Sequence, residues 1–236
     1  AIDFGLKKLF ILPLMNLDGK VYINTLSFRV MKKVKVLTER EAEKFLIKNG
    51  FNVTKTVFIS KESEINSALL KFNKRVVMKV SGEKIVHKTK VNGVRKNIFD
   101  YKKAVDVFRD LKKIKGFQGV LIQRQVKGEE FLLGLKKTKD FGYVVALAKG
   151  GSKVEKTKDV AFRVCGVEGV KEIINDVKAV MKLRSAQIHS LQKIIIDLCK
   201  LAKKKTNIKT LDINPLILEK NRAVIVDSQI ELESKK

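Results

Sequence analysis

The chain has 236 residues, of which 44% are apolar and 14 are glycine, values that predict a globular protein and exclude a disordered one. This length is enough for one large domain or for two smaller lobes that each bury a core. With 51 basic and 25 acidic residues the formal net charge is +26, which predicts attraction to polyanions such as nucleic acid, an anionic membrane, nucleotides or an acidic partner without choosing among them.

The two cysteines and two histidines limit the metal and redox chemistry of the chain. Cys165 and Cys199 form no CxxC motif, and with two histidines they give no plausible zinc-ligand set. We therefore expect reduced thiols and a cytoplasmic location. No apolar run approaches the roughly 20 residues that cross a bilayer, so we expect no membrane partner.

The first 33 residues differ from the rest of the chain, and we treat 1–33 as an N-terminal extension of unknown role. They hold an apolar patch and an Asp18-Gly19 turn signal, and a leader, an extension and the end of an upstream domain all fit them. A helix is predicted after them, because Thr38 and Glu41 have the spacing of a capping box and Asn49-Gly50 is a stop signal.

Residues 34–117 are predicted to form a first lobe in which helices alternate with strands. After the capped helix the hydrophobic periodicity predicts a strand over 56–59, a helix over 62–72, strands over 76–80 and 93–98, and a helix over 101–114. Lys115-Gly116 is a natural break between lobes.

Residues 118–236 are predicted to form a second, strand-rich lobe. The predicted strands lie at 120–122, 131–135, 142–148, 161–164, 210–218 and 223–226, with helices over 170–177 and 187–204 before the last two strands. The fold class that follows is α+β in two lobes.

The stretch 75–98 is the first candidate for chemistry. A β-branched run ends in Lys79, and a polar loop with His87 follows it. A lysine offers a compact positive charge for phosphate, and an imidazole can accept and donate a phosphoryl group near neutral pH. A solvated hairpin with an exposed lysine and histidine explains the same residues equally well.

The last predicted hairpin brings oxygen-bearing side chains together. Asp212 and Asn214 are two apart on one strand and face the same way, and Asp227 ends the next strand. Such a set suits Mg²⁺, which prefers oxygen ligands together with phosphate and water. Asp and Asn are also ordinary turn residues, and the pattern alone leaves the two interpretations even.

Three weaker signals lie between these stretches. Gly150-Gly151 follows a strand, where backbone amides could approach phosphate, although a plain turn is commoner. Glu130 begins a strand and could bind ribose hydroxyls or simply be exposed. Asp159 and Arg163 could form an ion pair or a phosphate clamp. His189, on the long helix, is interpreted as a surface or packing residue.

Taken in order, these motifs resemble one family over residues 34 to 232. The strand ending in Lys79 is followed by HKTKVNGV, EFLLG, FGYVV, GGSKVE, KDVAFR, LDINPL and VDS, which begin at residues 87, 130, 141, 150, 158, 211 and 226. This series resembles the ATP-grasp domain of the ADP-forming acyl-CoA synthetases, in particular the beta subunit of ADP-forming acetate–CoA ligase. The departures from the family pattern are Lys90, Asn92 and the polar pair Ser152-Lys153, which make the nucleotide loop more basic.

The resemblance implies an ATP-grasp fold whose two lobes hold ATP or ADP with Mg²⁺ between them. Lys79, Gly150, Gly151 and Arg163 would then contact the nucleotide, and the adenine-side hinge would be Gln123, Arg124, Gln125 and Val126. Glu130 would hold ribose or position phosphate, Asn214 and Asp227 would be metal ligands, and Asp212 would orient nearby groups or act as a ligand itself.

The resemblance also implies a mechanism and a partner. His87 would be a phosphohistidine carrier that passes a phosphoryl group to ADP, with acyl-CoA, ADP and phosphate giving acid, CoA and ATP. A separate CoA-binding alpha subunit would complete a hetero-oligomer and supply the acyl-CoA chemistry. The alternatives are another ATP-grasp ligase, such as succinyl-CoA synthetase beta, and a basic nucleic-acid-binding protein, for which the chain lacks a signature motif.

Overall fold

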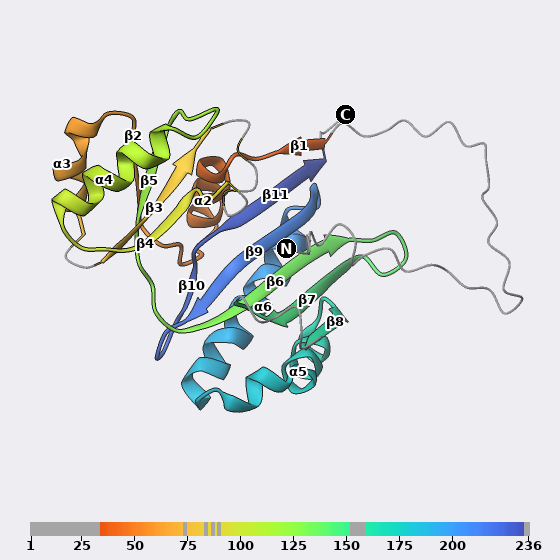
Figure 1. Cartoon of the computed structure of the whole chain (residues 1–236). Coiled ribbons are helices and arrows are strands. Elements are labelled where there is room, and N and C mark those ends of the chain that lie inside the picture. Colours follow the sequence, from red (N-terminus) through yellow and green to blue (C-terminus); the bar gives the residue numbers. More distant parts are fainter. Residues whose placement is uncertain are drawn as a thin grey trace, which may run out of the picture.

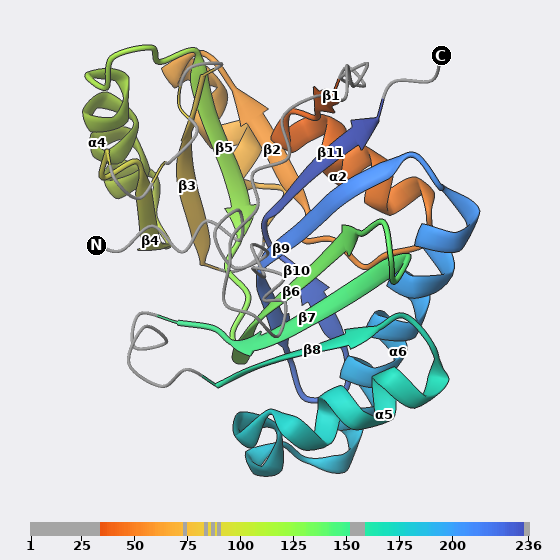
Figure 2. The same cartoon turned by 90° about the vertical axis from the view of Figure 1, so that its right-hand side faces the viewer.

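Two β-sheets, each with its own core, organise the chain (Figures 1 and 2). The computed structural model describes residues 34–72, 75–82, 85, 88, 91–151 and 159–233. One sheet has four strands and the other has seven, and helices cover both. The mixture of helices with largely antiparallel strands confirms the predicted α+β class.

The smaller sheet has the strand order β2-β5-β3-β4. Its strands are β2 (Thr56–Ile59), β3 (Val76–Ser81), β4 (Val94–Ile98) and β5 (Gly119–Arg124). The 3₁₀ helix η1 (Glu62–Glu64), the short helix α3 (Ile65–Leu69) and the helix α4 (Tyr101–Lys112) accompany it. Apolar side chains of α4, such as Phe108 and Leu111, join Met78 and Ile122 in a buried cluster that we call the small-lobe core.

The larger sheet has the order β1-β11-β9-β6-β7-β8, with β10 paired to β9. The strands are β1 (Val34–Val36), β6 (Glu129–Lys137), β7 (Tyr143–Lys149), β8 (Val160–Val164), β9 (Ile208–Leu218), β10 (Ala223–Ile225) and β11 (Ser228–Glu233). The long strand β9 is paired along one side by β6 and along the other by β10 and then β11. The residues between β10 and β11, Val226 and Asp227, therefore lie at a change of partner beside the middle of β9.

Three helices and one 3₁₀ helix bury the apolar face of the larger sheet. They are α2 (Glu39–Lys48), α5 (Val167–Asp176), η3 (Lys178–Lys182) and α6 (Ser185–Lys204). Leu46 of α2 and Leu198 of α6 are fully buried with Phe131 and Leu133 of β6 in the large-lobe core. None of the helices in the described part of the chain combines the length and apolarity needed to cross a membrane.

The predicted capping box of α2 is confirmed. The Glu41 amide donates to the Thr38 hydroxyl at 3.3 Å, and the Thr38 amide donates to the Glu41 carboxylate at 2.8 Å. These bonds satisfy two of the backbone amides that a helix N-terminus leaves without partners. Because the cap fixes where α2 begins, it also fixes the position of Glu39, the first residue of the helix.

The two sheets divide the chain at points other than the predicted boundary between 117 and 118. β5 lies after residue 118 but pairs with β2 and β3 of the smaller sheet. α2 lies before residue 117 but packs in the large-lobe core, and β1 pairs with β11. The hydrophobic pattern locates strands along the chain but does not say which sheet each one joins. We predicted no strand at β1 or β11, where the alternation is short.

The expectation of reduced thiols is wrong, because the structure joins Cys165 and Cys199 in a disulfide. Cys165 follows β8, Cys199 lies on α6, and the two are 34 residues apart in sequence with their Cα atoms 5.4 Å apart. CxxC spacing does not reveal the pair, because the residues after β8 meet α6 only in the folded chain. The disulfide ties the edge of the larger sheet to the helix that covers it.

Reduction of this disulfide is predicted to destabilise the larger lobe. In the chain-entropy model a loop of this length contributes about 3 to 4 kcal/mol. We expect dithiothreitol to lower the midpoint of thermal unfolding of the parent chain. The double variant Cys165→Ala/Cys199→Ala should unfold near the midpoint of the reduced parent and show no response to the reductant. Equal midpoints for the oxidised and reduced parent would contradict the prediction.

Candidate functional site

The smaller sheet reaches the larger lobe through two side chains that share one acceptor. Lys79 Nζ of β3 lies 3.3 Å from the Val226 carbonyl oxygen, and Gln123 Nε2 of β5 donates to the same oxygen at 2.9 Å. Val77, two residues before Lys79, is directly opposite Gln123, so both polar side chains project from the same face of the sheet. Lys79 and Gln123 are both buried, and the Gln123 amide nitrogen is also 3.2 Å from the Thr56 hydroxyl.

Asp227 and Asn214 lie side by side next to Lys79. The Asn214 amide donates to the Asp227 carbonyl oxygen at 3.0 Å, and Asp227 Oδ2 lies 3.7 Å from Lys79 Nζ. Asp227 Oδ1 accepts from the Ser228 amide at 2.9 Å, which orients the carboxylate. The predicted pairing of the last hairpin is confirmed, because β10 pairs with β9 in antiparallel register.

The donor set at this position fits a hard cation. The available side-chain atoms are a carboxylate and an amide oxygen, and the described residues hold no cluster of three or more His, Cys, Asp or Glu side chains. Mg²⁺ binds through one or two protein oxygens and completes its shell with water and phosphate. Asn214 and Asp227 would therefore hold Mg²⁺ together with a phosphate-bearing ligand and not in a closed protein cage.

Asp212 lies further along β9, away from Asp227. Its cross-strand neighbours are Gly134 of β6 and Gln229 of β11. Burial and the nearby Lys209 lower the pKa of the Lys136 ammonium, and the Asp212 carboxylate acts in the opposite direction. Asp212 and Lys136 therefore belong to a group of polar side chains on the larger sheet, which we call the polar strip. Asp212 lies two residues before Asn214 on β9.

A buried ion cluster joins the two lobes behind these groups. Glu39 of α2 contacts the ammonium group of Lys88, and its other oxygen is 3.6 Å from Lys79 Nζ. The side chains of Lys79, Glu39 and Lys88 are only 7%, 14% and 15% exposed. Burial lowers the pKa of the Lys88 ammonium, and the Asp227 carboxylate partly opposes that effect. Glu39 is a site residue that we did not predict, because its only local signal is its place in the capped first turn.

A second glutamate of α2 also faces the smaller lobe. The Thr56 hydroxyl of β2 donates to Glu43 Oε1 at 2.9 Å, one turn further along the helix than Glu39. Burial raises the pKa of the Glu43 carboxyl, and the hydrogen bond from Thr56 acts in the opposite direction. Glu39 and Glu43 thus turn one face of α2 into a polar contact with the smaller lobe, while Ala42 and Leu46 pack in the large-lobe core.

The predicted hinge residues run from the smaller sheet to the larger one. Arg124 Nη1 is 3.5 Å from Glu219, and the Gln125 side chain accepts from the Asn97 amide at 2.8 Å. Val126 is buried with Ile217 and Val224 of the larger lobe. The segment is thus anchored at both ends, as a connection between two lobes requires.

Glu130 and the two glycines are brought together by the β6–β7 pair. The Gly150 amide donates to the Glu130 carbonyl oxygen at 2.7 Å. A Cβ atom at Gly150 would lie 2.9 Å from that oxygen, and one at Gly151 would lie 3.8 Å from Glu130 Oε2. Gly151 also has a φ of +105°, which side-chain-bearing residues rarely adopt. Glycine is therefore required at 150 by space and favoured at 151 by conformation.

Arg163, a predicted nucleotide contact, is paired with acidic side chains of α5. Its guanidinium donates to Glu172 of α5 at 2.7 Å and contacts Asp176 of the same helix. Asp159 accepts from the amides of Lys178 and Ala179 at 2.8 Å each, and so caps η3. Both residues have local partners, and the described contacts give no support to the predicted phosphate clamp.

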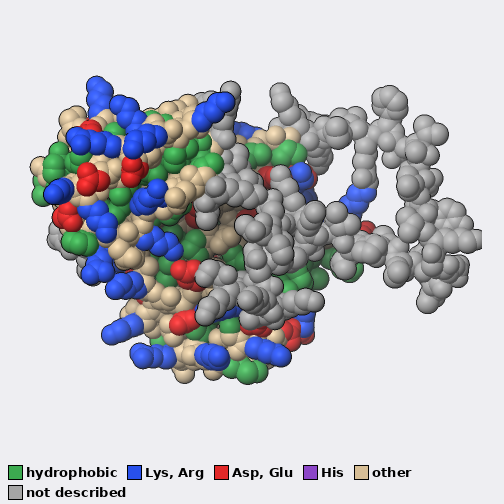
Figure 3. Space-filling model, in the orientation of Figure 1, with side chains coloured by type: hydrophobic (Ala, Val, Ile, Leu, Met, Phe, Trp, Pro, Cys, Tyr) green, Lys and Arg blue, Asp and Glu red, His purple; other side chains and the backbone are tan. Residues whose placement is uncertain are grey.

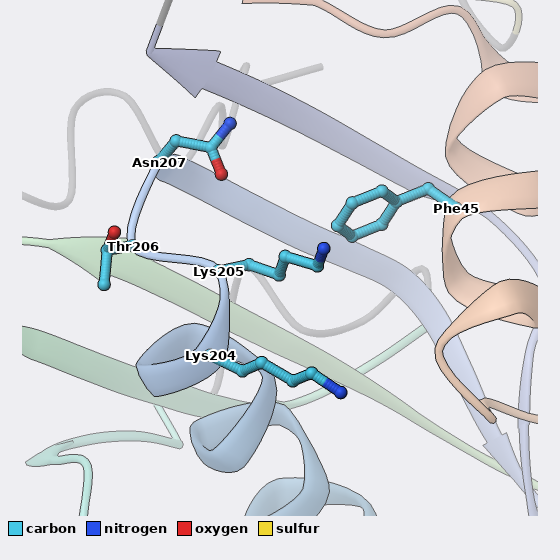
Figure 4. A pocket seen from close by; sticks show the side chains of 5 residues that line it. All are labelled: Phe45, Lys204, Lys205, Thr206 and Asn207. Carbon is cyan, nitrogen blue, oxygen red and sulfur yellow. The ribbon is translucent and has the colours of Figure 1, made fainter. Parts of the chain in front are cut away.

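Several predicted features lie outside the described residues. They include His87, Lys90 and the segment 152–158. The two described hollows, of about 300 and 260 Å³, lie away from Lys79 and Asp227. The first is lined by Phe45, Lys204, Lys205, Thr206 and Asn207, and Figure 4 shows the Lys205 side chain extending toward Phe45, with Lys204 one residue before it along the chain.

On the visible face of the molecule, positive side chains lie over both lobes. Figure 3 shows Lys and Arg side chains over both lobes, interspersed with other residues and without a continuous stripe. A nucleic-acid groove would need such a stripe, often with aromatic side chains that stack on bases. The visible surface therefore gives the nucleic-acid alternative no support beyond the net charge itself.

Comparisons with known proteins agree with this geometry. Residues 30–232 match the family model described as ATP-grasp domain. The chain is 32% identical over 212 residues to the ADP-forming acetate–CoA ligase I subunit beta of Pyrococcus furiosus, and the match covers 83% of this chain and 91% of that subunit. It is 30% identical over 209 residues to ADP-forming acetate–CoA ligase II of Archaeoglobus fulgidus, covering 85% of this chain but 31% of that protein. The chain thus spans most of a separate beta subunit and about a third of a longer relative.

The chain also resembles solved structures of an acetyl-coenzyme A synthetase. Acetyl-coenzyme A synthetase 1 of Ca. Korarchaeum cryptofilum, in complex with coenzyme A and Ca-AMPCP, has a TM-score of 0.75 at 27% identity, covering 84% of this chain and 93% of that one. Another structure of that synthetase, with Mg-AMPPCP, has a TM-score of 0.71 at 26% identity and the same coverage. Its phosphohistidine segment is described as pointing towards the nucleotide binding site.

Glu43 is predicted to give the contact between the lobes a measurable pH dependence. A carboxyl whose pKa is higher in the folded than in the unfolded chain stabilises the fold at low pH, and that stability is lost as pH rises above the unfolded value of 4.5 through the folded one. Glu43→Gln keeps an oxygen acceptor for Thr56 but does not titrate. We expect the unfolding free energy of the parent to fall relative to the variant between about pH 4 and pH 7, as measured by urea unfolding. A constant difference across that range would contradict it.

Proposed function

The chain belongs to the ATP-grasp family, which it shares with the ADP-forming acetate–CoA ligases, and from that membership we propose that it is the nucleotide-binding beta subunit of an ADP-forming acyl-CoA synthetase. In this role it would make ATP from acyl-CoA, ADP and phosphate. The observation that carries the proposal is the position of Lys79, whose ammonium group lies within 4 Å of Asp227 beside Asn214. A lysine next to two oxygen donors can hold a phosphate and the Mg²⁺ bound to it.

The nucleotide would lie between the two sheets. Lys79 would neutralise charge on its phosphates, and Gly150 and Gly151 would let backbone amides approach them. Glu130, whose carboxylate points at Gly151, would contact the ribose or position the phosphates. Gln123, Arg124, Gln125 and Val126 would border the adenine. The buried side-chain oxygen of Gln123 has no hydrogen-bond partner among the described residues and would be an acceptor there.

Asn214 and Asp227 would hold Mg²⁺, which supplies charge neutralisation for the transferring phosphoryl group when it is bound. Asp212 would act from the neighbouring position on β9, through the polar strip that includes Lys136. Arg163 remains a predicted nucleotide contact only if it exchanges its partners on α5.

We propose that His87 carries the phosphoryl group. A neutral imidazole nitrogen would accept the group from a histidine of the CoA-binding alpha subunit. An oxygen of the ADP β-phosphate would then bond to phosphorus as the phosphorus–nitrogen bond breaks, which returns the imidazole and forms ATP. Support comes from the HKT motif, and from Lys88, the next residue in sequence, which contacts Glu39 within the same ion cluster as Lys79. The phosphohistidine segment of the Korarchaeum synthetase provides a precedent.

The relatives support a partner subunit and leave the acyl group open. The match to a separately encoded beta subunit supports a hetero-oligomer with a CoA-binding alpha subunit. A 4-hydroxybutyrate–CoA ligase of Nitrosopumilus maritimus is as similar as the acetate enzymes, at 32% identity, so the acyl group is left open. We keep the cytoplasm as the proposed location of the assembly, although the Cys165–Cys199 disulfide removes reduced thiols as an argument for it.

The metal assignment predicts a specific loss in Asp227→Ala. In the parent chain, Mg²⁺ should strengthen ADP binding, because the ion links the phosphates to Asn214 and Asp227. In the variant that strengthening should fall at least about tenfold, as measured by calorimetry with and without Mg²⁺. Asp197→Ala removes a carboxylate from the exposed surface of α6 and should leave it unchanged. A normal response to Mg²⁺ in Asp227→Ala would remove Asp227 from the metal site.

The relay assignment predicts that His87→Ala abolishes ATP formation but still binds Mg-ADP. The substitution removes the carrier and leaves Lys79, Asn214 and Asp227 in place. With the alpha subunit present, labelled phosphate should appear on His87 of the parent in an acid-labile, base-stable form. His189 lies on the exposed side of α6. His189→Ala is therefore the matched control, and it should form ATP and bind Mg-ADP as the parent does. An active His87→Ala enzyme, or label on His189, would defeat the assignment.

A further inference from the structure

Glu39 is a buried carboxylate of the larger lobe that holds two lysines of the smaller one. It begins α2, whose Ala42 and Leu46 are fully buried in the large-lobe core, so its backbone is fixed to that lobe. One of its oxygens contacts Lys88 Nζ and the other lies 3.6 Å from Lys79 Nζ. The contacts therefore run between lobes, from one carboxylate to two ammonium groups.

The environment of Glu39 leaves it little support apart from these lysines. The side chain is 14% exposed, and its Oε1 atom is buried without a hydrogen-bond partner among the described residues. A carboxylate taken out of water is costly unless cations compensate it. Lys79 and Lys88 supply that compensation, and in return Glu39 neutralises two cations that are themselves largely buried.

A phosphate at Lys79 would have to compete with this carboxylate. The Lys79 ammonium has three N–H donors. One side of it faces the Val226 carbonyl oxygen, and Glu39 and Asp227 both lie within 4 Å. An incoming phosphate would be a further anion at the same group and would be repelled by both carboxylates. Asp227 has a second role as a proposed metal ligand, which leaves Glu39 as the anion that opposes the phosphate.

We propose that Glu39 is a positioning residue that holds Lys79 and Lys88 in place by occupying, in the nucleotide-free protein, the position of a phosphate oxygen. This inference rests on the proposed function. The nucleotide's phosphates replace the Glu39 carboxylate at the lysines when they bind. The carboxylate therefore keeps the lysines ordered and paired at the expense of affinity for phosphate.

The test is the affinity of Glu39→Gln for free pyrophosphate and for Mg-ADP, measured by calorimetry on the full chain. A glutamine keeps the shape of the side chain but removes the competing charge. We expect Glu39→Gln to bind pyrophosphate at least about tenfold more tightly than the parent. The gain should persist at high salt, because buried charges are screened much less than exposed ones.

Glu41→Gln is the matched control. It removes the same charge from the same first turn, where glutamine still serves a capping box. Glu41 is exposed and paired with Lys35 on the surface, so its removal should change the affinity by less than about twofold. A role of Glu39 as a simple structural brace predicts the opposite result, since Glu39→Gln would then bind pyrophosphate no more tightly than the parent. Such a result would overturn the proposal.

A second comparison covers the case in which Glu39→Gln does not fold. Lys88→Gln and Glu39→Gln/Lys88→Gln differ only at Glu39, and the double variant removes a buried pair together, which is tolerated better than removal of one partner. The double variant should bind pyrophosphate more tightly than Lys88→Gln, because Lys79 is released.

The two probes separate this proposal from the proposed function. If Glu39→Gln bound pyrophosphate more tightly than the parent but no folded chain bound Mg-ADP, the role of Glu39 would be supported and the nucleotide assignment would be overturned. Binding of Mg-ADP without any tightening would do the reverse. No binding of either probe by the parent and the variants would overturn both.

Discussion

The carbonyl oxygen of Val226 is the point on which the arrangement of the two lobes depends. It accepts hydrogen bonds from Lys79 and Gln123, which lie on adjacent strands of the smaller sheet. Val226 itself stands where β9 changes partner from β10 to β11, so its carbonyl is not used up by a regular strand ladder. The same change of partner puts Asp227 next to Lys79. One backbone position therefore sets both the contact between the lobes and the spacing of the proposed phosphate and metal groups.

This contact explains why α2 belongs functionally to both lobes. Its apolar face joins the large-lobe core, and its first turns present Glu39 and Glu43 to Lys79, Lys88 and Thr56 of the smaller lobe. Removal of one member of a buried ion pair typically costs about 3 to 5 kcal/mol. The lobes are thus joined by polar groups whose strength depends on charge, which a bound anion can alter far more easily than it could alter an apolar interface.

The sequence predicts the parts of this design that depend on local pattern. The Thr38–Glu41 capping box, most strands and the pairing of β9 with β10 are visible in periodicity and turn residues. The match of ordered motifs to the ATP-grasp family also identifies Lys79, Asn214 and Asp227, which the structure brings together. The contact of Glu39 with Lys88, the disulfide of Cys165 with Cys199 and the assignment of β5 to the smaller sheet are not visible. They join residues distant in sequence, and no spacing rule encodes which partner a buried charge or thiol will meet.

Arg163 shows that a residue within a recognised motif can have partners that the motif does not predict. Its sequence context, KDVAFR, fits the family motif, yet the guanidinium is engaged by Glu172 and Asp176 of α5. A motif gives the type of a residue and its order in the chain. The ion-pair partner of Arg163 depends instead on the acidic side chains of α5, the helix that packs beside it. Residues 152–158 lie outside the described part of the chain. In the described part of this motif, the structure adds the contact of Arg163 with α5.

The net charge of the chain and the charge of the site act over different distances. The formal net charge of +26 attracts any polyanion, and Figure 3 shows Lys and Arg side chains over both lobes on the visible face. Exposed charges, however, are screened within about 10 Å at ordinary ionic strength. At the site the balance is close to even, because Lys79 and Lys88 face Glu39 and Asp227. Attraction to the surface therefore does not select a ligand. Under the proposal for Glu39, selection would arise where an incoming phosphate exchanges places with that carboxylate at Lys79. A ligand that also satisfied Asn214, Asp227 and the hinge would gain most from the exchange.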